Sequence, residues 1–220
     1  MASVTVERLV TPRGELVLRR DDGVPGRHYE IVSNGVFLMD TRDGRSEREL
    51  VRAALGGAPD GARVLIGGLG VGFSLAEALR ASAVGHVTVV EVEPAVVRWH
   101  RGPLAPYSAG GLDDPRVEVV VADLADFLAG GDGLFDSVCL DVDNGPEWTV
   151  TPGNVALYGD PGLDAVGRRL APGGTLAVWS ANAAPGFEAR LRARYPTVHT
   201  RRIPVARGEP DVLYLARSRR

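Results

Sequence analysis

Residues 62–82 read ARVLIGGLGVGFSLAEALRAS, and this stretch decides the fold. An apolar run typical of a buried strand leads directly into a cluster of glycines, and apolar residues then recur with helical spacing. In such a strand–turn–helix unit the glycines let the backbone turn sharply and approach a ligand, and the N-terminus of the helix attracts polar or anionic groups. We therefore predict that Gly68, Gly70 and Gly72 bind a cofactor.

The same alternation of strand and helix continues toward the end of the chain. Further apolar segments, separated by segments with helical spacing, lie at 86–92, 116–123, 135–141 and 175–181. Continuous apolar strands joined by helices indicate an α/β fold with a mostly parallel sheet that is buried on both faces. The two last strand-like segments are joined by a turn and are predicted to pair antiparallel.

The region before residue 62 has a different pattern. Short extended segments alternate with turn signals, and the Asn-Gly pair at 34–35 predicts a β-hairpin. Ser46 followed by Glu49 matches a helix capping box with Ser46 as the N-cap. We predict a small antiparallel β domain with a linking helix at 1–56, and a Rossmann-like nucleoside-binding catalytic domain at 57–220.

Composition excludes several classes of protein. The 220 residues carry a formal net charge of −3 and are 45% hydrophobic, so the chain is globular and is not drawn electrostatically to nucleic acid or to anionic membranes. Cys139 is the single cysteine, which excludes an internal disulfide. The histidines lie on separate elements without metal-ligand spacing, so we expect surface or packing roles for them and no metal. With no signal-peptide pattern and no bilayer-length apolar run, we expect a cytoplasmic protein without membrane association.

Two acids follow the next strands at positions that suit a nucleoside. Glu91 ends the strand after the glycine loop, where a carboxylate can accept from both ribose hydroxyls. Asp123 follows the third strand, where it can accept from an adenine amino group, act as a helix N-cap, or do both. No arginine near the loop offers a clamp for a pyrophosphate, so a single nucleoside with a sulfonium tail fits at least as well as a dinucleotide.

Asp141 and Asp143 alternate at the carboxyl end of a predicted central strand, where ligands bind in open α/β sheets. A carboxylate there can position a nucleophile and accept its proton, and two carboxylates attract a cationic acceptor. Alternatively, the pair caps the turn that follows. Glu147, Trp148 and Tyr158 lie in the same region and are candidates for the wall of an acceptor pocket, although Trp148 fits a core position equally well.

In combination, these segments resemble the spermidine synthase group of AdoMet-dependent transferases. The resemblance rests on VLIGGLGVGFSLAEAL, VTVVEVEP, LDDPRVEVVVADLADFL and FDSVCLDVDNGP, in that order. It implies a Rossmann-like seven-stranded transferase sheet preceded by a small β domain, and a homodimer. It also implies that Glu91 holds the ribose, that Asp123 and Leu124 line the adenine, and that Asp141 lies beside the reacting sulfonium.

The chain departs from this family where the amine is recognised. The family's aspartate that pairs with the amine of the aminopropyl donor corresponds to Val71, and a tyrosine-glutamine pair corresponds to Glu47 and Arg48. Val71 leaves no anion for a decarboxylated donor. Arg48 either holds the carboxylate of AdoMet or is a solvated helix residue, and Glu47 could replace the missing acid on the substrate side.

We therefore expect an AdoMet-dependent transferase that moves an alkyl group, most simply methyl, to a small-molecule acceptor that the sequence does not identify. The first alternative is an aminopropyltransferase that uses decarboxylated AdoMet and a di- or polyamine. The second is a non-catalytic nucleoside-binding protein.

Overall fold

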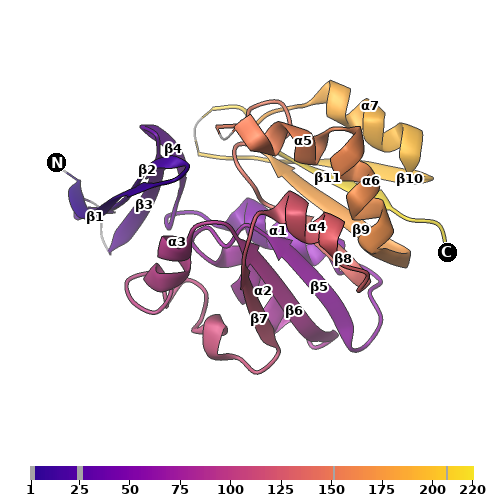
Figure 1. Ribbon diagram of the computed structural model, residues 1–220, viewed down its shortest axis with the longest axis horizontal. Helices are drawn as coiled ribbons and strands as arrows, with labels where there is room; N and C mark the ends of the chain where they lie inside the picture. The colour runs from indigo at the N-terminus through magenta and orange to yellow at the C-terminus, as the bar shows by residue number, and fades with distance from the viewer. Residues whose placement is uncertain (1–2, 24–26, 151, 207) are drawn as a thin grey trace.

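The computed structural model describes residues 3–23, 27–150, 152–206 and 208–220. The N-terminal part forms a four-stranded antiparallel sheet in the order β1-β2-β3-β4 (Figure 1). Its strands are β1 (Val4–Thr11), β2 (Gly14–Asp21), β3 (His28–Ser33) and β4 (Val36–Asp40). The hairpin predicted at 34–35 is confirmed between β3 and β4, and both of its residues have positive φ angles, 51° and 78°.

The rest of the chain builds a seven-stranded sheet in the order β10-β11-β9-β8-β5-β6-β7. The strands β5 to β9 pair in parallel, and β11 is antiparallel to both β9 and β10. The predicted α/β class, the small N-terminal β unit and the antiparallel pairing of the last two strands are thus confirmed. The strands are β5 (Ala62–Gly67), β6 (Val84–Glu91), β7 (Val117–Val121), β8 (Phe135–Leu140), β9 (Leu170–Ser180), β10 (Thr197–Ile203) and β11 (Asp211–Arg217).

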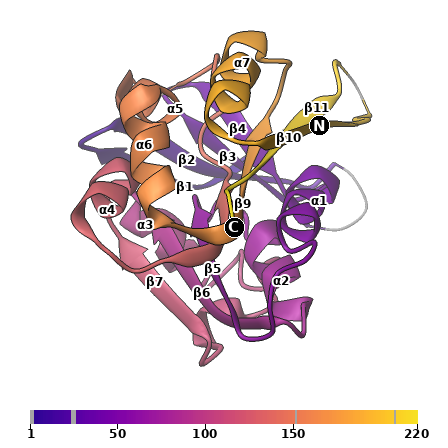
Figure 2. The same cartoon turned by 90° about the vertical axis from the view of Figure 1, so that its right-hand side faces the viewer.

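Helices cover both faces of the large sheet, as continuous apolar strands require. Figure 2 shows α1 and α2 on one side of the sheet and α4 and α6 on the other. Successive residues of β5 accordingly enter different apolar clusters, Val64 and Ile66 one, Leu65 the other. The helices are α1 (Arg45–Ala54), α2 (Phe73–Arg80), α3 (Pro94–Trp99), α4 (Leu124–Gly130), α5 (Val155–Tyr158), α6 (Asp160–Arg169) and α7 (Pro185–Arg194). Across the described ranges, none of them has the length and apolar character needed to cross a membrane.

The small sheet is fastened to the large one by polar contacts. Thr11 and Arg13 both donate to the Glu93 carboxylate, at 3.0 and 2.7 Å, just before α3. Apolar residues of the small sheet also belong to the core cluster that contains Val64. Helix α1 packs against α2, β9 and β11, so the predicted linking helix lies with the larger unit in space. The division at residue 56 stays a prediction.

The start of α1 differs from the predicted capping box. The helix begins at Arg45, and Gly44 is its N-cap without a side-chain hydrogen bond, so the prediction that Ser46 caps it was wrong. Ser46 lies one position inside the helix, where its hydroxyl donates to Glu47 at 3.1 Å. Glu49 instead forms a surface ion pair with Arg201.

The order of strands places the functional edge of the sheet. The chain runs from β5 outward to β6 and β7, and returns to the other side of β5 through β8, so the order reverses between β5 and β8. Parallel strands end at the same edge, and ligands of such sheets bind at this point of reversal. The Asp141 N–H donates to the Gly67 carbonyl at 3.0 Å, which brings the glycine loop and the end of β8 together.

Candidate active site

A cavity of about 1210 Å³ opens at this edge of the sheet. Its walls come from the ends of the parallel strands, from β4 of the small sheet, from the first turn of α1 and from the start of β11. Ligand pockets for drug-sized molecules commonly measure about 300–1000 Å³. The cavity is therefore large enough for a nucleoside together with a second small molecule.

The glycine loop forms part of the cavity wall through Gly68 and Gly70, but Gly72 does not line it. A Cβ atom on Gly68 would lie 2.3 Å from the Asp141 carbonyl oxygen, and one on Gly70 would lie 2.3 Å from the Met39 sulfur. Protein atoms thus fill the space that these glycines leave free. The close approach that requires glycine is packing between loop, β4 and the end of β8.

Glu91, Asp123 and Leu124 line the cavity near the ends of β6 and β7, where the sequence predicts the nucleoside. Glu91 is buried and its carboxylate accepts from the Leu69 N–H at 2.9 Å. Burial raises the pKa of Glu91, and the hydrogen bonds from the Glu93 and Leu69 N–H groups act in the opposite direction. Asp123 also caps α4, because its carboxylate accepts from the Ala125 N–H at 2.8 Å. The N-cap role that the sequence left open is therefore confirmed, and it leaves the second oxygen of Asp123 available to a ligand.

The carboxylate of Asp141 follows the end of β8, where the sequence predicts a catalytic group. It borders the cavity, and it accepts a hydrogen bond from the Ser74 hydroxyl at 3.5 Å. Burial among protein atoms is the main cause that raises the pKa of Asp141, and the negative charge of Asp211 adds to the effect.

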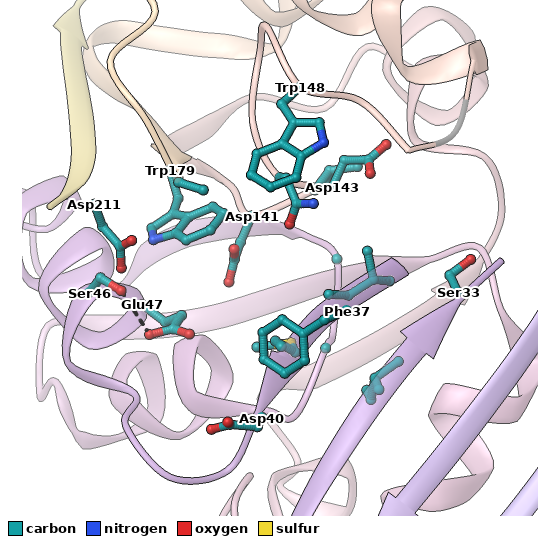
Figure 3. Close-up of a pocket in the computed structure, with 18 of the residues that line it drawn as sticks. Ser33, Phe37, Asp40, Ser46, Glu47, Asp141, Asp143, Trp148, Trp179 and Asp211 are labelled. Atoms are coloured by element: carbon teal, nitrogen blue, oxygen red, sulfur yellow. Dashed lines mark hydrogen bonds between the residues drawn. The ribbon is translucent and has the colours of Figure 1, made fainter. Parts of the chain in front are cut away.

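Two further acids lie beside Asp141, as Figure 3 shows: Glu47 from the first turn of α1, and Asp211 from the start of β11. Glu47 is only 7% exposed. Its pKa is raised chiefly by burial and then by the charges of Asp141 and Asp211. The indole of Trp179 lies in the same group, and its buried N–H has no hydrogen-bond partner within the described part of the chain. Burial raises the pKa of Asp211, and the nearby Ser46 and Trp179 side chains partly offset this effect by favouring the charged carboxylate.

No arginine neutralises these three acids among the residues described. The arginines that line the cavity are engaged elsewhere: Arg13 with Glu93, Arg42 with three acids of the small sheet, and Arg45 with Asp43. The described His, Cys, Asp and Glu side chains also form no group of three arranged to hold a metal ion. Glu47 is buried and the two aspartates are partly buried, and carboxylates removed from water without a counter-charge are costly, so the inner end of this cavity is suited to a cationic ligand.

Asp143 has different hydrogen-bond partners from Asp141. Its φ angle is 63°, and its two oxygens accept from the Val150 N–H at 2.7 Å and from the Asn154 amide at 2.8 Å. In Figure 3 its carboxylate points away from the group around Asp141. Asp143 lines the cavity, and these two bonds connect it to the loop after β8; the catalytic and turn-capping roles considered for the pair stay predictions.

Besides Gly72, three predicted site residues lie outside the cavity wall. The Arg48 guanidinium stacks 4.1 Å from the centroid of the Phe73 ring. Glu147 accepts from the backbone N–H groups that open α7, and Tyr158 is fully buried with its hydroxyl donating to the Val142 carbonyl at 2.6 Å. Of the predicted acceptor wall, Trp148 does line the cavity and is 52% exposed, so the core alternative for it was wrong.

Sequence reasoning missed three contributors to the cavity: Asp211, Trp179 and Phe37. A signal for Asp211 was present. Because β11 is antiparallel to β9, its first residue reaches the edge where the parallel strands end. Phe37 is 50% exposed and lies across the cavity from Trp148 in Figure 3, on the small sheet whose position the sequence did not predict.

The architecture and the cavity define the class of the chain: a Rossmann-like protein with the seven-stranded sheet of AdoMet-dependent transferases. A search against family models matches the spermine/spermidine synthase domain to residues 45–183. The chain belongs to the spermine/spermidine synthase family.

Individual relatives agree with this assignment. Polyamine aminopropyltransferase 1 of Streptomyces coelicolor is 37% identical over 170 residues, which are 76% of this chain and 31% of that protein. Polyamine aminopropyltransferase of Mycobacterium tuberculosis is 35% identical over 168 residues, 74% of this chain and 30% of that protein. Putrescine N-methyltransferase 1 of Nicotiana tabacum is 34% identical over 128 residues, 58% of this chain and 32% of that protein. The chain thus spans about a third of the length of the curated relatives that it matches.

Solved structures share the fold over nearly the whole chain. A spermidine synthase in complex with the transition-state analogue AdoDATO has a TM-score of 0.80 at 19% identity, over 97% of this chain and 73% of that one. Spermidine synthase from Thermotoga maritima has a TM-score of 0.77 at 19% identity, over 97% of this chain and 72% of that one. The sequence-based prediction of a spermidine synthase-like fold is confirmed.

Proposed function

We propose that the chain transfers an aminopropyl group from decarboxylated AdoMet to an amine of a di- or polyamine. The observation that carries this proposal is the group of three acids, Glu47, Asp141 and Asp211, that lie at the inner end of the cavity without a basic side chain paired to them among the described residues. Both the decarboxylated donor and a polyamine acceptor present ammonium groups. Charge-assisted hydrogen bonds to buried carboxylates are a strong way to hold them.

The remaining cavity residues suit the nucleoside of the donor. Glu91 offers acceptors for ribose hydroxyls, while Asp123 and Leu124 offer an acceptor and an apolar surface for adenine. The bound donor supplies a carbon activated by its positive sulfur. The chain's own residues orient the two substrates and manage the proton.

Asp141 is the group that we assign to proton transfer. The acceptor nitrogen must be uncharged to attack, because an ammonium has no lone pair. Its lone pair forms the new N–C bond, the C–S bond breaks with its electrons left on sulfur, and the proton released from nitrogen passes to Asp141. A carboxylate whose pKa is raised by burial is a better base near neutral pH than an exposed one.

Methyl transfer from AdoMet to a diamine is the second candidate. The likeness to putrescine N-methyltransferase 1 favours it. So does Val71, which occupies the position of the aspartate that pairs with the aminopropyl donor in the family. Against it, the carboxylate of AdoMet would face the acids at the inner end, and the arginines lining the cavity are already paired. We therefore rank aminopropyl transfer first, reversing the order that the sequence suggested.

A product assay distinguishes the candidates. The purified chain is incubated with putrescine or spermidine and either decarboxylated AdoMet or AdoMet, and products are identified by mass spectrometry. Methylthioadenosine together with an aminopropylated amine supports the proposal. S-adenosylhomocysteine with a methylated amine supports the second candidate. Binding of methylthioadenosine without turnover of either donor would favour a non-catalytic nucleoside-binding protein.

A further inference from the structure

Hydrogen bonds hold the backbone of the glycine loop at both of its ends. The Gly68 N–H donates to the Val90 carbonyl at 2.9 Å, and the Gly72 N–H donates to the Leu69 carbonyl at 2.9 Å. Together with the bond from the Leu69 N–H to Glu91, these contacts fix both ends of the loop. The peptide unit between Gly70 and Val71 lies in the middle, and Gly70 borders the cavity.

Two side chains from different parts of the fold hold this peptide unit. Its carbonyl oxygen, on Gly70, lies 2.9 Å from Nε2 of His100, and its N–H, on Val71, donates to the Met39 sulfur at 3.2 Å. His100 follows the last turn of α3, whereas Met39 belongs to β4 of the small sheet. The thioether is a weak acceptor, so the imidazole makes the stronger of the two contacts.

The tautomer of His100 follows from its partners, and its neutral form follows from burial. A carbonyl can only accept, so Nε2 must carry a hydrogen. Nδ1 lies 3.0 Å from the Ser108 hydroxyl, and in the neutral ring it accepts the hydroxyl hydrogen in place of the more distant Ala105 carbonyl, which lies 3.3 Å from the same oxygen. His100 is 2% exposed and Ser108 is fully buried, and burial lowers the pKa of His100. A neutral imidazole with one defined tautomer therefore lies directly behind the loop.

The requirement for glycine at position 72 supports this arrangement. Gly72 does not line the cavity, and a Cβ atom there would lie 2.6 Å from Cε1 of His100 and 2.7 Å from Cβ of Ser108. The loop therefore packs closely on the His100–Ser108 pair on the side where Gly72 lies.

We propose that His100 is a positioning residue for the donor: its Nε2–H fixes the Gly70–Val71 peptide unit in the orientation that binds the adenosyl moiety. Glycine lacks the steric limits that would hold this peptide unit by itself. Without the imidazole this peptide unit samples other orientations. The ligand must then order the loop as it binds, and the free-energy cost of this ordering weakens its affinity. This inference rests on the proposed function only in assuming that the cavity binds an adenosyl thioether.

A matched pair of substitutions tests it. In His100→Gln the amide nitrogen reaches about as far as imidazole Nε2, whereas in His100→Asn it reaches only as far as Nδ1. We expect methylthioadenosine, measured by calorimetry, to bind His100→Asn about tenfold more weakly than wild type, the upper range for one net hydrogen bond. His100→Gln should stay within about threefold. In turnover assays the KM for the donor should rise in the Asn variant, while the KM for the amine and kcat stay near wild type.

Equal binding by wild type and His100→Asn would overturn the proposal, as would equally weak binding by both variants, because the loss would then come from packing. Should neither variant fold, Ser108→Ala provides the test: it frees the imidazole to rotate and should weaken binding by a smaller factor, and no change would overturn the proposal.

If wild type binds no adenosyl thioether, the proposed function fails. Backbone hydrogen exchange at residues 68–72 then tests, without a ligand, whether His100 holds the loop. Faster exchange in His100→Asn than in His100→Gln supports this, and equal exchange refutes it.

Discussion

Replacing Glu47 by glutamine should stabilise the ligand-free protein and weaken its hold on an amine. Glu47 is only 7% exposed, and the negative charges of Asp141 and Asp211 act on its carboxylate. Glutamine keeps the shape of the side chain and resembles the protonated acid, so it removes a charge that burial and two neighbouring carboxylates make unfavourable. The two effects have opposite signs, which separates a binding residue from a structural one.

The pH dependence follows from the direction of the shift. The pKa of Glu47 is raised from an ordinary value of 4.5 in the folded protein. The stability that its protonated form contributes is therefore complete below pH 4.5 and is lost as the pH rises through the raised pKa. The variant should match wild type at pH 4 and exceed it increasingly toward pH 9. Each unit of pKa shift corresponds to about 1.4 kcal/mol, so a gain of at least ~1 kcal/mol, or about 2–4 °C in Tm, is expected.

Amine binding should change the other way. Loss of one charge-assisted hydrogen bond costs about 1.5–3 kcal/mol, so the dissociation constant of spermidine or the KM for the amine should rise roughly 10- to 150-fold. Thermal unfolding between pH 4 and 9 and calorimetry at pH 8 measure both effects. Glu49→Gln is the matched control on the same helix: it weakens surface ion pairs with Arg201 and Arg52, each worth about 0–1 kcal/mol, and should not affect amine binding.

The reasoning would be refuted by a Glu47→Gln variant that is no more stable than wild type at pH 9. It would also be refuted by a variant that is more stable but binds the amine unchanged, since Glu47 would then be a buried acid without a role in recognition.

Other perturbations address the remaining parts of the site. Asp141→Asn should lower turnover by roughly 10²–10⁴-fold while methylthioadenosine affinity stays near wild type, and turnover within a few-fold would exclude Asp141 as the base. Glu91→Ala should weaken methylthioadenosine binding by about 1.5–3 kcal/mol in calorimetry, and unchanged affinity in a folded variant would mean that Glu91 does not hold the ribose. Wild type should bind decarboxylated AdoMet at least about tenfold more tightly than AdoMet, because only AdoMet brings a carboxylate to the acids. Arg48→Gln should alter neither dissociation constant by more than about threefold, since its guanidinium lies on Phe73 outside the cavity; a selective loss of AdoMet binding would restore the earlier role of Arg48.

Local patterns predicted parts of both sheets well because each of these signals is short in sequence. The glycine loop after β5, the hairpin at 34–35 and the antiparallel last strands follow from turn chemistry and apolar periodicity within a few residues. Glu91, Asp123 and Asp141 could be placed because parallel strands end at one edge, so three distant residues share a location once the topology is known.

What could not be predicted depends on tertiary packing. Arg48 and Glu47 are adjacent in sequence, and helical geometry turns neighbouring side chains about 100° apart, so the two point in different directions. The side chosen depends on how α1 packs against α2 and β9, which the sequence does not state. His100 likewise shows no motif, because its partners Gly70 and Ser108 are identified only when α3 lies behind the loop.

The position of the acids shows how a motif can mislead when it is compared one residue at a time. Val71 in place of the family's aspartate suggests that the donor keeps its carboxylate. In the structure, however, Val71 is fully buried and lies outside the cavity wall, whereas Glu47 and Asp211 reach that wall from α1 and β11. A cationic ligand responds to the total charge within a few ångströms and not to the element that supplies it. The electrostatic character of the cavity is therefore a property of three segments brought together by the fold, and it supports a cationic substrate tail even though the glycine loop itself carries no acid.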